Sequence, residues 1–337
     1  MISTRISQQY GIDHPVIGAG MGIVAMPPLV AAISNAGGMG TLGAGLLPPD
    51  AVRGMIAQIR SMTSKSFGVN FITQFANEAH VDAAIEGQPN VISFHWNDLP
   101  VTLIERVKKA GIPVWVQVGT LAMARDAVKL GVDAIIAQGS ESGGHVRGEA
   151  STLVLLPAII DAVGPATPVI AAGGIADGRG MAAALALGAD AVWVGTRFLA
   201  SNEATAHPEY KRRVVVAGPG DTLVTTLFGP EWPDRQRVLV NRVVREWGHR
   251  VEQIPDELRK APSIGKTMMG PDPYDMPKFS VFLPIPETQG DFEEMNMVAG
   301  ESSGLIHDVQ PAAQIVTGMV KQAEQIITRL PATVRAG

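Results

Sequence analysis

The chain has 337 residues, of which 46% are hydrophobic and 18% charged, with a formal net charge of −5 and no cysteine. The lack of cysteine excludes disulfides, thiolate metal sites and a cysteine nucleophile. Negative net charge without a long basic run argues against nucleic acid as a partner. We find no apolar stretch of signal-peptide or membrane-spanning length, so we expect a cytoplasmic protein with no membrane contact.

Eight short apolar runs recur across the first 200 residues. They are Val16–Gly18, Gly40–Leu42, Phe67–Phe71, Val91–Phe94, Val114–Val118, Ala134–Ala137, Pro168–Ala171 and Ala191–Val194. Because they do not alternate strictly between apolar and polar residues, they are typical of parallel strands that are buried on both faces. Helical segments that end at glycine separate them, such as Leu99–Ala110, Leu121–Leu130 and Gly180–Leu187. Eight tandem β-then-α units predict an α/β fold of the closed (β/α)₈ TIM-barrel type. They favour this barrel rather than a doubly wound sheet, which usually has fewer strands.

The βα rhythm stops after about residue 200. Residues 218–286 are rich in Pro, Gly, Asp and Arg, and we predict one helix there, near Arg237–Trp247. A final amphipathic helix is predicted at Pro311–Leu330. We therefore predict a barrel made of residues 1–217 with 305–337, and a cap of residues 218–304 on its substrate side.

One glycine motif is misleading. Gly38, Gly40 and Gly43 have the spacing of the dinucleotide-binding fingerprint. That fingerprint needs a strand before it and a helix after it, whereas here a predicted helix at Pro28–Asn35 leads through the glycines into a strand. We interpret the motif as a helix C-cap and a tight turn.

Glycines also follow four of the predicted strands, where the carboxyl ends of barrel strands form the ligand-binding face. The candidate ligand contacts are Met21 and Gly22 after the first strand, Gly139, Gly143 and Gly144 after the sixth, Gly173 and Gly174 after the seventh, and Gly195 and Thr196 after the eighth. The loops after strands seven and eight form the common phosphate site of this fold. The need for a tight turn would explain the glycines after a single strand. Glycines after four strands at the same end of the barrel instead predict a ligand site.

Polar side chains end several of the same strands. Asn70, Gln117 and Gln138 are amides at or near strand ends, where they need hydrogen-bond partners, either a flavin ring edge or an internal network. His145 ends the glycine-rich stretch after Gln138 and is the candidate catalytic residue. His95, at the end of the fourth strand, either faces substrate or is a satisfied core histidine. We predict no metal, since no His, Asp and Glu set has ligand spacing.

The segments Gln138–His145, Ala171–Gly178 and Val194–Phe198 together resemble the nitronate monooxygenase family, and the resemblance covers nearly the whole chain. It implies a TIM barrel, non-covalent FMN and catalysis by His145. Carried over by motif, the implied flavin contacts are Asn70, Gln138, Gly143, Gly174 and the turn at Val194, Gly195 and Thr196, with Met21 and Gly22 against the ring. Family members often carry glutamine where this chain has Ala299–Glu301, so the resemblance assigns Glu301 no flavin contact.

The resemblance implies oxidation of alkyl nitronates by O₂ to a carbonyl compound and nitrite. Relatives that share the pattern leave an alternative, an NAD(P)H-dependent reductase of quinones or enoyl thioesters such as enoyl-acyl carrier protein. The barrel alone also allows a third class, a non-flavin lyase or isomerase acting on a phosphorylated metabolite. The physiological substrate, the electron donor and whether the chain forms a homo-oligomer stay open.

Overall fold

The computed structural model describes residues 2–45, 47–95, 98–229, 234–260, 263–270 and 272–330. Eight parallel strands form one sheet in the order β1-β9-β8-β6-β5-β4-β3-β2. A parallel bridge between Ile17 and Met39 brings β1 back beside the entrance to β2, so the sheet curls into a barrel. The predicted TIM barrel is confirmed.

The barrel strands fall where the apolar runs predict them. They are β1 (Val16–Gly18), β2 (Gly40–Gly43), β3 (Phe67–Ile72), β4 (Val91–His95), β5 (Val114–Val118), β6 (Ala134–Gln138), β8 (Val169–Ala172) and β9 (Ala191–Val194). The helices around them are α1 (Arg5–Gln9), α2 (Pro27–Asn35), α3 (Pro49–Met62), α4 (Glu78–Glu86), α5 (Val101–Lys109), α6 (Leu121–Lys129), α7 (Thr152–Val163), α8 (Gly178–Ala186), α9 (Thr196–Leu199) and α10 (Pro208–Val216). The predicted final helix is α13 (Ala312–Arg329), which packs against α8 and α2.

Two apolar layers hold the barrel together. A large outer cluster lies between strands and helices, and a smaller one fills the interior with side chains that include Ile17, Val91, Trp115 and Trp193. The Trp115 indole N–H donates to the Tyr10 hydroxyl, at 2.9 Å. The interior is thus a packed core, and its apolar filling leaves polar side chains for the strand ends.

We call residues 218–304 the cap; they contain β10 (Thr222–Thr225), β11 (Gln236–Leu239), α11 (Arg242–Trp247), a 3₁₀ turn at Val251–Gln253, α12 (Asp256–Arg259), β12 (Gly265–Met269), β13 (Asp272–Met276) and β14 (Gln289–Gly290), and a second 3₁₀ turn, Glu301–Leu305, begins at their end. β12, β13 and β14 form one antiparallel sheet. The other sheet has the order β10-β11-β7, in which β7 (Gly144–His145) belongs to a loop of the barrel. The cap is therefore joined to the barrel by a backbone ladder as well as by the chain.

The prediction of one helix near Arg237–Trp247 is wrong in its first half. Residues Gln236–Leu239 are the strand β11, and the helix begins after Asn241, whose side chain accepts from the backbone N–H of Val244. β10, which precedes it in the chain, and β7, which is distant in sequence, supply the ladder partners of β11. Such partners override the local preference of a short segment.

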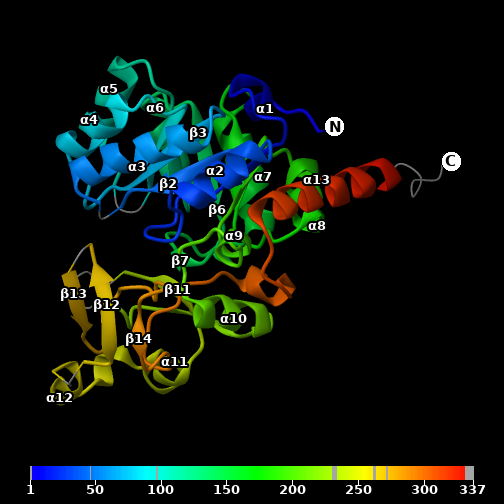
Figure 1. Ribbon diagram of the computed structural model, residues 1–337. Coiled ribbons are helices and arrows are strands. Elements are labelled where there is room, and N and C mark those ends of the chain that lie inside the picture. The colour runs from blue at the N-terminus through cyan, green and yellow to red at the C-terminus, as the bar shows by residue number, and fades with distance from the viewer. Residues whose placement is uncertain are drawn as a thin grey trace.

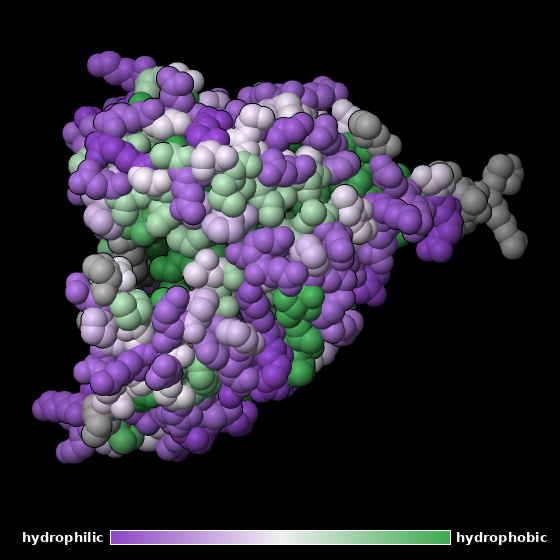
Figure 2. Space-filling model, in the orientation of Figure 1, coloured by the Kyte–Doolittle hydropathy of each residue, from purple (hydrophilic) through white to green (hydrophobic). Residues whose placement is uncertain are grey.

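The cap lies against one end of the barrel (Figure 1). In the same view, the surface is hollowed between the barrel and the cap, and apolar side chains gather in this hollow (Figure 2). None of the helices in the described ranges is long and apolar enough to cross a bilayer.

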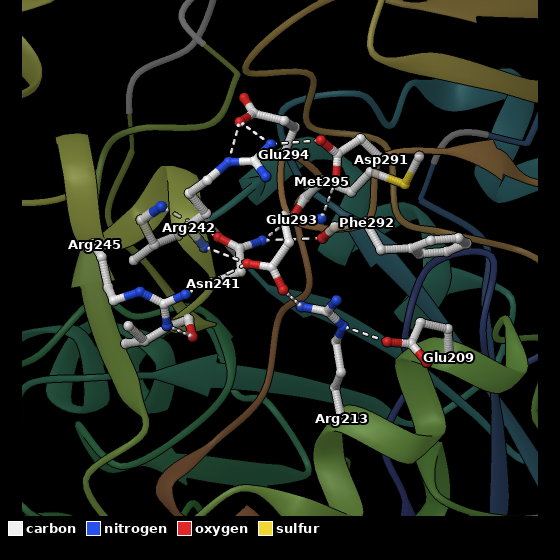
Figure 3. Close-up of polar contacts among 12 residues, drawn as sticks. Glu209, Arg213, Asn241, Arg242, Arg245, Asp291, Phe292, Glu293, Glu294 and Met295 are labelled. Atoms are coloured by element: carbon white, nitrogen blue, oxygen red, sulfur yellow. Dashed lines mark hydrogen bonds and ion pairs between the residues drawn. The ribbon is translucent and has the colours of Figure 1, made fainter.

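Ion pairs connect the cap to α10, which precedes it in the chain (Figure 3). Arg213 on α10 donates to Glu209 at 2.8 Å and to Glu293 at 2.6 Å. On the other side of this cluster, Arg242 pairs with Asp291 and Glu294. Because Arg213 is only 19% exposed in its side chain, its pairs are less screened by water than ordinary surface pairs.

Candidate functional site

The carboxyl ends of β3 to β6 carry a layer of inward-facing polar side chains. Val91 and Trp115 belong to the interior cluster, so strand alternation places Ser93 and His95 on β4, and Gln117 on β5, on the same inward side. Ala134 and Ile136 place Gln138 there in the same way. Asn70 on β3 joins this layer through its contacts with β4. The structure thus gathers the three predicted amides and His95 at one end of the barrel.

Asn70 is the centre of a hydrogen-bond network at this end. Its amide nitrogen donates to the carbonyl of Gly20 at 3.1 Å and lies 2.9 Å from His95 Nδ1. Its amide oxygen accepts from the hydroxyl of Ser93 at 2.8 Å. Internal partners therefore satisfy this predicted flavin contact, which leaves fewer of its atoms for a ligand.

His145 lies in β7, where it pairs with Gln236 of the cap. Its backbone carbonyl accepts from the side-chain amide of Gln138 at 2.8 Å. One residue further on, the Val146 N–H donates to the carbonyl of Arg235. The backbone of His145 is therefore fixed from two sides, by a barrel strand and by the cap, so its imidazole is positioned at their junction.

Both site histidines are neutral at pH 7. Burial, together with smaller effects of a protonated His95 and of the positive charge of Arg147, lowers the pKa of His145 to about 3. Burial lowers the pKa of His95 to about 4, against a smaller opposite effect of the Phe71 carbonyl. A neutral imidazole offers one donor and one acceptor.

Two buried polar atoms at the site have no hydrogen-bond partner among the described residues. They are Oε1 of Gln138 and Oγ of Ser142. Such atoms are uncommon in folded proteins, and a ligand is one way to satisfy them. Ser142 is a site residue that the sequence did not single out, since its only signal is its place inside the glycine-rich stretch before His145.

The predicted glycines divide into two groups. A Cβ on Gly139 would collide with Thr152, and one on Gly143 would collide with the backbone of Gly300, so packing alone requires glycine at both positions. In contrast, a Cβ on Gly22 or Gly144 would point into open space.

The loops after β8 and β9 have glycines at which backbone N–H groups could contact a ligand. Gly173 and Gly174 have φ of +104° and +73°, which side-chain-bearing residues rarely adopt. A Cβ on Gly195, which follows Val194, would be in ordinary contact with Met21 at 3.6 Å. Successive N–H groups in turns of this kind can bind an anion.

Thr196 and Glu301 take part in internal contacts. The Thr196 hydroxyl accepts from the backbone N–H of Gly300 at 3.0 Å, so only its remaining atoms are open to a ligand. Glu301 pairs with Arg237 at 3.0 Å, and Arg237 also donates to the carbonyl of Ser140. These contacts hold the end of the cap against the glycine-rich loop that carries His145.

Comparison with known proteins agrees with this architecture. The family model described as nitronate monooxygenase matches residues 3–84 and 72–322. A probable nitronate monooxygenase of Staphylococcus aureus is 32% identical over 96% of this chain and 98% of its own length. A dehydrogenase of Mycobacterium tuberculosis, (3aS,4S,5R,7aS)-5-hydroxy-7a-methyl-1-oxo-octahydro-1H-indene-4-carboxyl-CoA dehydrogenase, is 42% identical over 67% of the chain, which spans only 63% of that relative's length.

Solved structures show the same likeness. FabK from Thermotoga maritima superposes with a TM-score of 0.80 at 36% identity, over 99% of this chain and 100% of that one. A nitroalkane oxidase from Streptomyces ansochromogenes superposes with a TM-score of 0.77 at 28% identity, over 96% and 99% of the two chains. The chain therefore belongs to the nitronate monooxygenase family of oxidoreductases, whose enzymes are flavoproteins.

Proposed function

We propose that this protein oxidises alkyl nitronates with O₂, using FMN, to a carbonyl compound and nitrite. The observation that carries the proposal is the neutral imidazole of His145 at the junction of barrel and cap, beside unsatisfied polar atoms on the barrel rim. Membership of the nitronate monooxygenase family supports the same chemistry. When bound, FMN supplies a two-electron acceptor that O₂ can reoxidise.

The residues present fit FMN. Oε1 of Gln138 would accept from a ring N–H, and the space over Gly22 would receive one face of the ring. The backbone N–H groups of Gly174 and Gly195, with the Ser142 hydroxyl, would bind the phosphate.

Glu141 lies near this phosphate position, since a Cβ on Gly174 would be 3.7 Å from its carboxylate. Both of its oxygens accept from the backbone N–H of Thr152, at the N-terminus of α7. Its negative charge is thus already balanced by the positive end of a helix dipole, which reduces its repulsion of a phosphate.

His145 would act on the nitro group. A nitronate is already deprotonated, so the imidazole needs only to donate a hydrogen bond to one of its oxygens. With a neutral nitroalkane, the imidazole would instead accept the α-proton. Arg147, whose charge acts on His145 and whose guanidinium lies 3.3 Å from Asp234, would favour an anionic substrate at this position.

Anaerobic reduction of the bound flavin tests the proposal. Purified protein should release FMN, and mixing with ethyl nitronate without O₂ should bleach the flavin faster than mixing with NADH or NADPH. Admission of O₂ should then yield nitrite and aldehyde. Rapid bleaching by a pyridine nucleotide together with inertness toward nitronate would reject the proposal in favour of a reductase.

A second candidate is the oxidation of a carboxyl-CoA compound. The observation that favours it is the 42% identity to the dehydrogenase of Mycobacterium tuberculosis, although the shared region is 67% of this chain. A saturated acyl-CoA thioester belongs in the same anaerobic experiment. Bleaching by the thioester, with none by nitronate, would establish this candidate instead.

A further inference from the structure

His95 has two competing neighbours at one ring nitrogen. Its Nδ1 lies 2.9 Å from Nδ2 of Asn70 and 3.1 Å from the carbonyl oxygen of Phe71. The first contact requires a lone pair on Nδ1, and the second requires a proton there. A neutral imidazole has one N–H, so only one of these contacts is a hydrogen bond, and the choice sets the state of Nε2.

The orientation of Asn70 decides between them. Its Nδ2 faces the carbonyl of Gly20, which can only accept, and its Oδ1 faces the hydroxyl of Ser93, which can donate. If the amide were flipped, its oxygen would face the carbonyl oxygen of Gly20, and neither atom could donate a hydrogen bond. The second proton of Asn70 Nδ2 is therefore directed at Nδ1 of His95, which must hold a lone pair.

The carbonyl of Phe71 does not need the imidazole. It belongs to the β3–β4 ladder, in which Ile72 pairs with His95 and the Thr73 N–H donates to the carbonyl of His95. In a parallel ladder that pairing also presents the backbone N–H of His95 to Phe71. The imidazole therefore keeps its proton on Nε2, as a neutral donor.

This donor lies at the end of the barrel where the substrate is predicted to bind. His95 is the last residue of β4, on the inward face and one layer above Ser93, at the end of the barrel that the cap covers. His145 is held at the same end of the barrel, because its backbone carbonyl accepts from the side chain of Gln138, which ends β6. No residue within the described ranges forms a hydrogen bond with Nε2 of His95.

We propose that His95 is a substrate-binding residue, which donates Nε2–H to one oxygen of a planar, two-oxygen anion while His145 donates to the other. The inference rests on the proposed function, because a nitronate carries two oxygens on one nitrogen and can accept one hydrogen bond from each of two imidazole donors. A thioester carbonyl has one oxygen and needs one donor. Paired neutral imidazoles thus select the nitronate class.

The tautomer can be measured without any substrate. In FMN-loaded protein labelled with ¹⁵N at histidine, the signals of His95 are those that disappear in His95→Gln. We expect the proton on Nε2 and an unprotonated Nδ1 at pH 7. A proton on Nδ1 would overturn the proposal, because Nε2 would then have no hydrogen to donate.

Binding supplies the second test. Butyrate is a planar two-oxygen anion that the flavin does not oxidise, and its affinity can be followed by the change in flavin absorption. Glutamine places an amide nitrogen near the position of Nε2, whereas asparagine places one near Nδ1. We expect His95→Gln to keep butyrate affinity within about threefold and His95→Asn to lose about 10- to 100-fold, at equal FMN content, since a hydrogen bond to a charged group is removed.

Equal affinities in the two variants, or no binding of butyrate to the unaltered protein, would overturn the proposal. The outcome is separable from that of the proposed function. Butyrate binding that depends on His95, in a protein that nitronate does not reduce, would refute nitronate oxidation and leave the role of His95 intact. If nitronate reduced the flavin equally fast in both variants, nitronate oxidation would be supported and the role of His95 would be refuted.

Discussion

The barrel and the cap are stabilised by different interactions. The barrel strands β2, β8 and β9 are buried at every residue, and their side chains form continuous apolar layers. The cap strands β12 and β13 are antiparallel, and each has one buried residue among five. Ion pairs such as those of Arg213 and Arg242 hold the cap segments to one another and to α10 (Figure 3).

The barrel and the cap therefore contribute differently to the candidate site. The barrel contributes rigid strand ends, with Asn70, His95 and Gln138 fixed by a packed interior. The cap contributes the ladder that holds His145 in place, through Gln236. Loss of cap structure should therefore disturb catalysis before it disturbs the fold or the cofactor.

The largest expected effect is on flavin reduction in His145→Ala. A positioned acid–base or hydrogen-bonding group contributes about 10² to 10⁴ in rate, so we expect a loss of that size. FMN content should not change, because the predicted cofactor contacts lie on the barrel. Stopped-flow reduction, expressed per bound flavin, measures the effect.

The choice of substrate refines this first prediction. A base that removes the α-proton is needed for a nitroalkane and not for a preformed nitronate, so His145→Ala would then be impaired chiefly with the nitroalkane. Equal losses with both substrates would indicate that His145 binds the anion. A normal rate per flavin with both would remove His145 from the mechanism.

Cofactor binding on the barrel side should respond to Gly22→Val. The new side chain would point into open space in the protein without ligand, so the fold should tolerate it, yet it would occupy the volume assigned to the ring. We expect a loss of about 1 to 3 kcal/mol, roughly 10- to 100-fold in FMN affinity. Gly318→Val on α13, where a Cβ also meets nothing, is the control. Equal FMN titrations of the two variants would place the flavin elsewhere.

A smaller effect, on stability, should follow from Arg213→Met. The change removes the contact with Glu293 and the second arginine at Glu209, so each partly buried carboxylate loses one donor, at a cost of about 1 to 2 kcal/mol in the free energy of unfolding. Arg212 also pairs with Glu209 but is 59% exposed, so Arg212→Met should leave denaturant unfolding unchanged. Indistinguishable unfolding curves for the two variants would show that the cluster adds no stability.

The smallest expected effect is a change of pKa in Arg147→Gln. The positive charge of Arg147 lowers the pKa of His145, so its removal should raise that pKa from about 3 toward its ordinary value of 6.5. Arg235→Gln, which removes a pair with Glu149, should leave it unchanged. An NMR titration of the His145 ring measures both. A fall in the pKa in Arg147→Gln would contradict the assignment.

The same shift determines the direction of the pH dependence of stability. The folded pKa of His145 lies below its unfolded value, so between pH 6.5 and 3 the unfolded state binds more protons. Stability from this residue is complete above pH 6.5 and declines as the pH falls through this window. The decline should end at a higher pH in Arg147→Gln.

The barrel was predictable from sequence because its signals are local and repeated. Continuous apolar runs marked each parallel strand, and glycines marked the helix ends, so the strand predictions at Val16–Gly18, Val114–Val118 and Ala191–Val194 match β1, β5 and β9 to the residue. The cap lacked such repetition. β11 is a strand because it pairs with β10 and with β7, and no local pattern in the sequence indicates the pairing with the distant β7.

The sequence predicts which polar residues lie together at the end of the barrel, but not their hydrogen-bond partners. Placing Asn70, Gln138 and His145 together needed only the rule that strand ends meet at one face of a barrel. The packing reasons for Gly139 and Gly143, and the tautomer of His95, depend on contacts with Thr152, Gly300 and other distant residues.

A crystal structure of the FMN-loaded protein tests the central claim most directly. The account predicts that the phosphate contacts the backbone of Gly174 and Gly195, and that the ring lies over Gly22 with His145 and His95 facing its open side. A flavin bound away from the hollow between barrel and cap, or with His145 turned from the ring, would contradict it.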